Sequence, residues 1–135
     1  MRKAFERSLN SLGDVLEFVD AFAEQESLGS RTAFATRLVT EELFANFVRH
    51  NRGGSDRIEV DLTARAGCLT LRLWDFGVER FDLSHRGPVD VGKPLSERTA
   101  GGLGLHFIRS YFDELTYDYS DGTICVTATR RLQEG

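Results

Sequence analysis

Two polar residues inside an apolar helical pattern are the first candidates for chemistry. Glu42 and Asn46 are four residues apart, so a helix places their side chains on one face, and His50 continues the same line. A carboxylate can orient or deprotonate a hydroxyl group, and an amide oxygen is a neutral, hard ligand suited to Mg2+. The alternative is the solvated polar side of an amphipathic helix, which the neighbouring Glu41 favours.

A second candidate site lies where a strongly patterned strand meets a loop. Asp75 at this point can accept a hydrogen bond from an exocyclic amine, and Gly77 lets a flat ligand approach the backbone. The alternative is a capped turn without a ligand.

A glycine cluster precedes the last helical pattern of the chain. Gly101, Gly102 and Gly104 fall within four residues. Adjacent glycines expose backbone N–H groups, and a helix N-terminus favours anions, so this stretch predicts a phosphate cradle. It is not a P-loop, because no Gly-Lys-Ser/Thr follows, and a long loop instead of a strand leads into it, unlike a Rossmann fingerprint. A structural turn is the alternative.

Length and composition exclude several classes of protein. The chain has 135 residues and a mass of 15.2 kDa, which predicts one domain with its own core. A net charge of -4 disfavours a nucleic-acid binder, and the apolar runs are too short to span a bilayer. Cys68 and Cys125 have no metal-ligand spacing, and the N-terminus lacks the apolar stretch of a secretory signal. A cytoplasmic protein is therefore expected.

Hydrophobic periodicity predicts the elements that must position these residues. An N-cap at Ser11 and a stop at Gly29 bound the first helix, and Ser30 caps the second. The order predicts the α+β class, with one sheet covered on one face by three helices. Strands are expected at 3–9, 58–63, 69–74, 115–119 and 123–131, and helices at 12–26, 30–50 and 102–112.

The three motifs together resemble those of the Bergerat-fold ATPases, the superfamily of gyrase, MutL and histidine kinases, along essentially the whole chain. Residues 42–46 are similar to the N box, 75–77 to the first glycine box and 101–105 to the second, with the ATP lid at about 78–100. This resemblance implies a single domain, 1–135, folded as a two-layer α/β sandwich with a mixed, mostly antiparallel sheet. Further stretches are similar to the anti-sigma factor serine/threonine kinases, namely 94–109, 113–115 and 122–132.

The resemblance also implies a role for each matched residue. Glu42 would be the catalytic base and Asn46 the Mg2+ ligand. Asp75 would accept the adenine amine, with Gly77 against the base and Thr123 near it. The nucleotide's phosphates would lie on a loop of five residues, Gly101, Gly102, Leu103, Gly104 and Leu105.

The implied activity is that of an ATP- and Mg2+-dependent serine/threonine protein kinase acting as an anti-sigma regulatory factor. Such a kinase phosphorylates a STAS-type anti-anti-sigma protein and switches partners with a sigma factor; homodimerisation is expected from the family, and nucleic-acid or membrane contact is not. Glu79 stands where the first glycine box usually has a second glycine. That departure favours the alternative, a nucleotide-gated protein-binding module with little or no kinase turnover.

Overall fold

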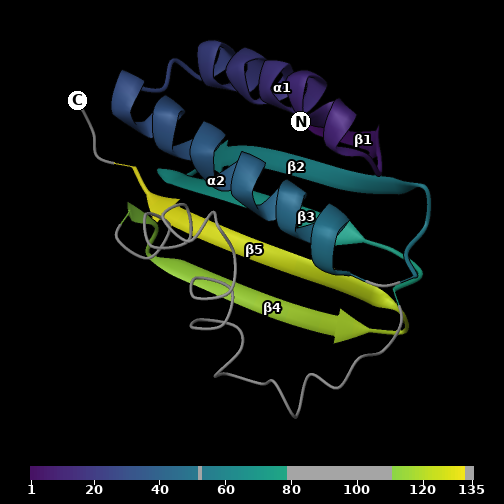
Figure 1. Cartoon of the computed structure of the whole chain (residues 1–135). Coiled ribbons are helices and arrows are strands. Elements are labelled where there is room, and N and C mark those ends of the chain that lie inside the picture. The colour runs from purple at the N-terminus through teal and green to yellow at the C-terminus, as the bar shows by residue number, and fades with distance from the viewer. Residues whose placement is uncertain (52, 79–110, 133–135) are drawn as a thin grey trace.

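The computed structural model of the chain describes residues 1–51, 53–78 and 111–132. Two helices lie on the same face of a five-stranded sheet whose order is β1-β2-β3-β5-β4 (Figure 1). The strands are β1 (Arg2–Glu6), β2 (Arg57–Arg65), β3 (Cys68–Asp75), β4 (Glu114–Ser120) and β5 (Thr123–Arg131), and the helices are α1 (Leu12–Gln25) and α2 (Ser30–His50), with a short 3-10 helix, η1 (Leu9–Ser11), before α1.

The expected α+β class and two-layer architecture are confirmed, with one correction, while the third helix stays a prediction. Every strand pair among the described residues is antiparallel, so this part of the sheet is not mixed. The described residues contain two long helices instead of three, because the helix expected at 102–112 falls almost entirely outside them.

The alternating pattern of the strands becomes one continuous apolar layer. In the sheet register Val60 lies opposite Leu73, and Leu73 lies opposite Val126, so the inward rows of three strands coincide. These rows pack against the apolar faces of both helices to form the core. The buried apolar residues of these three strands are Ile58, Val60, Leu62, Leu69, Leu71, Leu73, Ile124, Val126 and Ala128.

The predicted helix caps differ in detail from the observed ones. The Ser11 side chain makes no capping bond, because its hydroxyl donates to the Glu6 carbonyl oxygen at 2.8 Å. Helix α1 ends at Gln25, before the expected Gly29, because Ser27 takes the left-handed conformation (φ 53°) and the Leu28 N–H donates to the Ala23 oxygen at 2.9 Å. This is a Schellman closure without glycine.

The opposite face of the sheet carries polar and aromatic side chains. Trp74 points away from the core there, and the Arg2 guanidinium lies 3.9 Å from the centre of its ring. Cys68 and Cys125 are both free thiols. Within the described ranges, neither helix is long and apolar enough to cross a membrane.

Candidate functional site

The C-terminal half of α2 carries the first pair of candidate residues. Leu43, Phe44 and Phe47 are buried in the core and fix this part of the helix against the sheet. Asn46 is buried with them at 4% exposure, and its Nδ2 has no hydrogen-bond partner among the described residues. A buried amide without a partner is costly in a folded protein. The solvated-face alternative therefore does not hold for Asn46.

Glu42 lies one helical turn before Asn46 and is half-buried. Burial raises the pKa of its carboxyl group; the positive charge of Arg49 opposes this shift and the negative charge of Glu41 adds to it. Glu41 itself is exposed, so the two adjacent glutamates differ in environment. A carboxyl group with a raised pKa is better matched to accepting a proton near neutral pH than an ordinary glutamate.

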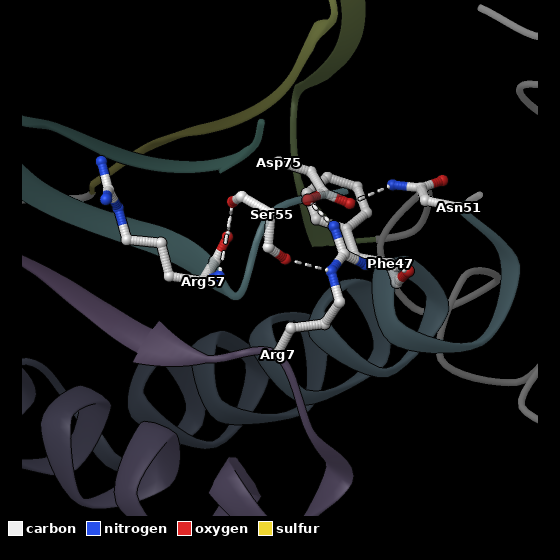
Figure 2. Close-up of polar contacts among 6 residues, drawn as sticks. All are labelled: Arg7, Phe47, Asn51, Ser55, Arg57 and Asp75. Carbon is white, nitrogen blue, oxygen red and sulfur yellow. Dashed lines mark hydrogen bonds and ion pairs between the residues drawn. The ribbon is translucent and has the colours of Figure 1, made fainter. Parts of the chain in front are cut away.

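Asp75 lies at the end of β3 and is fully buried. Arg7 forms an ion pair with its Oδ1, and the Asn51 side-chain amide donates to its Oδ2 at 2.7 Å (Figure 2). The carboxylate is thus held on both oxygens. A buried carboxylate with an arginine and an amide as partners differs from a simple capped turn, the alternative given in the sequence analysis.

Arg7 joins three other segments of the chain at this point. Its Nε donates to the Ser55 carbonyl oxygen at 2.8 Å, and its Nη1 donates to the Phe47 carbonyl oxygen at 3.1 Å (Figure 2). The Phe47 oxygen belongs to the last turn of α2, whose partial negative charge favours a cation. Burial lowers the pKa of the Arg7 guanidinium. The end of α2, the loop after it and the end of β3 are therefore fixed around one cation.

Glycine-containing loops close the same edge of the sheet. Gly77 has a φ of 65°, and its oxygen accepts from the Gly54 N–H at 2.8 Å. The Val78 N–H donates to the Gly122 oxygen at 2.8 Å, which places the turn before β5 against this loop. Thr123, half-buried, directly precedes Ile124, the register partner of Asp75. Gly77 and Thr123 therefore lie at the same sheet edge as Asp75.

The remaining predicted site residues lie outside the part of the chain that the structure describes. The lid at about 78–100, apart from Val78, lies outside the described residues, and so does Glu79. The same holds for the predicted phosphate loop, which comprises Gly101, Gly102, Leu103, Gly104 and Leu105.

The donor set on α2 fits a metal ion that arrives with a nucleotide. In the part of the chain that the structure describes, no group of three or more His, Cys, Asp or Glu side chains could hold a metal ion. Mg2+ usually takes one or two protein ligands and completes its coordination with phosphates and water. The amide oxygen of Asn46, one helical turn from the half-buried Glu42, is a ligand type that suits such a shared site, whereas the unpartnered Nδ2 is a donor and does not bind a cation.

Two residues of this region, Arg7 and Gly54, were not found from the sequence as site residues. Arg7 lies 68 residues from Asp75 along the chain, and no local pattern marks it as the partner of a buried carboxylate. The sequence marks this region only by the glycine pair at Gly53 and Gly54, a pattern typical of a turn.

Gly54→Ala is expected to lower the free energy of unfolding by about 2 kcal/mol, measured by chemical denaturation. Gly54 has a φ of +74°, and a Cβ atom there would overlap the Arg7 guanidinium. Because that guanidinium is fixed by three acceptors, it cannot move away freely. Gly13→Ala in α1 is the control, since nothing lies within 4 Å of its added Cβ. Equal stability of the two variants would contradict the tight packing of Arg7 on Gly54.

Comparison with known proteins identifies the family of this fold and site. The model of the histidine kinase-like ATPase domain matches residues 5–130. The chain belongs to the histidine kinase-like ATPase domain family. Within this family, the serine-protein kinase RsbW of Listeria monocytogenes serotype 4a is 31% identical over 104 residues, and that of Listeria innocua is 30% identical over 104 residues.

The alignment with these histidine kinase-like ATPase relatives is partial. It covers 73% of this chain and 65% of each relative. Among solved structures, the histidine kinase domain of the Erythrobacter litoralis EL346 blue-light activated histidine kinase has a TM-score of 0.56 and 17% sequence identity, covering 92% of this chain and 60% of that one. This likeness supports the fold alone.

Proposed function

We propose that the protein is an ATP- and Mg2+-dependent serine/threonine protein kinase that acts as an anti-sigma regulatory factor. Its family and its similarity to proteins named serine-protein kinase support this proposal. The observation that carries it is the pairing on α2 of the half-buried Glu42, whose pKa is raised, with the buried amide of Asn46 one helical turn later. Phosphoryl transfer needs a positioned acceptor for the hydroxyl proton and a ligand for the metal on the phosphates.

In this proposal each residue has one role. Glu42 accepts the proton of the substrate hydroxyl group, and Asn46 holds Mg2+, which supplies charge neutralisation on the phosphates when bound. Asp75 accepts a hydrogen bond from the adenine amine, and Gly77 and Thr123 lie beside the base. The phosphates are assigned to the backbone N–H groups of Gly101, Gly102, Leu103, Gly104 and Leu105.

The proposed domain comprises residues 1–135, with the ATP lid at about 78–100. The proposed substrate is a STAS-domain anti-anti-sigma protein, and the proposed second partner is a sigma factor, which places the protein in the cytoplasm. A homodimer is part of the same proposal. The chain aligns with only 65% of the length of these relatives. The partners named here are therefore part of the proposal and rest on the family resemblance.

The test is transfer of labelled phosphate from ATP to a purified STAS-domain protein in the presence of Mg2+. We expect label on the STAS protein and none when Mg2+ is chelated. A thermal shift with ADP and Mg2+ measures nucleotide binding separately. Stabilisation by nucleotide without label transfer would refute the kinase and favour the nucleotide-gated binding module. The absence of both would refute nucleotide binding altogether.

A further inference from the structure

Arg7 is more constrained than a surface arginine in an ion pair. Its side chain is 14% exposed, and its guanidinium donates to Ser55, Phe47 and Asp75 (Figure 2). By contrast, the ion pair of Arg37 with Asp20 at 2.9 Å has side chains that are 44% and 53% exposed. Burying a guanidinium is unfavourable unless its donors are satisfied. The position of Arg7 is therefore dictated by its acceptors, of which Asp75 is the only charged one among the described residues.

The ion pair fixes both the charge and the orientation of Asp75. A carboxylate as deeply buried as Asp75 would take up a proton if it had no cation beside it. Arg7 on Oδ1 compensates the negative charge of the Asp75 carboxylate. Together with Asn51 on Oδ2, it also restricts rotation of that group. A carboxylate has about four lone-pair sites. Two contacts therefore leave acceptor capacity for a ligand, and the ionised group has no proton to donate.

This difference matters for the edge of a purine base. A 6-amino purine presents N–H donors at position 6, whereas a 6-oxo purine presents a carbonyl acceptor there. An ionised carboxylate accepts from the first and repels the second, while a protonated carboxyl group can also donate to the second. The charge state of Asp75 therefore decides which bases the site accepts.

We propose that Arg7 is a positioning residue for base recognition: by holding Asp75 as a fixed, ionised acceptor, it makes the site select 6-amino over 6-oxo purine nucleotides. This inference rests on the proposed function, which places the base at Asp75. It adds to that function a residue from the N-terminal segment, outside all three recognised motifs.

The experiment compares ADP with inosine diphosphate by titration calorimetry in the presence of Mg2+. The wild-type protein is expected to prefer ADP, and Arg7→Met is expected to lower the ratio of the two affinities by about tenfold or more. Arg7→Lys keeps the positive charge and is expected to restore most of the preference. Arg37→Met is the matched control and is expected to leave the ratio unchanged, because Arg37 pairs with Asp20 on the surface.

Each outcome has a defined consequence. A folded Arg7→Met protein with the wild-type ratio would overturn the inference and make Arg7 a structural anchor only. Wild-type protein that binds neither nucleotide would overturn the proposed function, and this inference with it. If Arg7→Met does not fold, the crystal structure of the wild-type ADP complex decides: an intact Arg7–Asp75 pair with the amine on Asp75 supports the inference, and displacement of Arg7 by the base overturns it.

Discussion

Glu42→Gln is expected to lower the rate of phosphoryl transfer by roughly 10²–10⁴-fold while ADP binding is retained. Glutamine has the same shape but cannot accept the proton of the substrate hydroxyl group. In the proposed function, nucleotide binding depends on Asp75 and the glycine loops, which lie outside this change. The rate of label transfer and the ADP affinity, measured on the same preparation, test both parts.

The chain itself provides a control for this experiment. Glu41 is adjacent, exposed and chemically identical, so Glu41→Gln changes the net charge by the same amount without touching the buried side of α2. Its transfer rate is expected to match that of the wild-type protein. Similar losses in the two variants would show that charge near the helix matters and that Glu42 is not the proton acceptor.

The pH dependence follows from the raised pKa of Glu42. As a proton acceptor it is active when ionised, so kcat/KM should fall on acidification at a pH above the ordinary pKa of a glutamate. The effect on stability has the opposite sign. As the pH rises, Glu42 loses its proton in the unfolded chain at a lower pH than in the folded protein. Above the ordinary pKa of a glutamate, burial of Glu42 therefore lowers the free energy of unfolding. Glu42→Gln should therefore unfold at a temperature no lower than the wild-type protein at pH 7.

The later strands and the two described helices were predictable because each carries its own periodicity, whereas the first strand, expected at 3–9, runs only from Arg2 to Glu6. Ile58, Val60 and Leu62 alternate with polar residues, and the structure buries all three. The helix ends were less predictable. Ser27, not glycine, takes the left-handed position after α1, because the Leu28-to-Ala23 hydrogen bond compensates the strain.

The candidate site was predictable only where its residues form a local motif. Glu42 and Asn46 share a helix face, so their spacing alone brings them together. Arg7 reaches Asp75 only through the order of the strands, with β1 beside β2 and β2 beside β3. A contact between two elements that are not adjacent in the sheet depends on tertiary packing, which no spacing in the sequence encodes.

Asp75→Asn is expected to lower the free energy of unfolding by about 3 kcal/mol, because it leaves the Arg7 guanidinium buried without its counter-charge. Asp20→Asn is the control: it breaks an exposed ion pair with Arg37, and the expected loss is below about 1 kcal/mol. Chemical denaturation measures both values. Equal losses would show that burial does not strengthen the Arg7–Asp75 pair.

The same substitution separates the stability role of Asp75 from its binding role. In the double variant Arg7→Met, Asp75→Asn, neither charge is left unpaired, so the loss of stability should be smaller than the sum of the single losses by about 1–3 kcal/mol. ADP affinity should fall by roughly ten- to a hundredfold in Asp75→Asn and stay low in the double variant, because an amide oxygen is a weaker acceptor than a carboxylate. If the double variant recovered ADP affinity together with stability, Asp75 would be a structural partner of Arg7 and not the acceptor of the base amine.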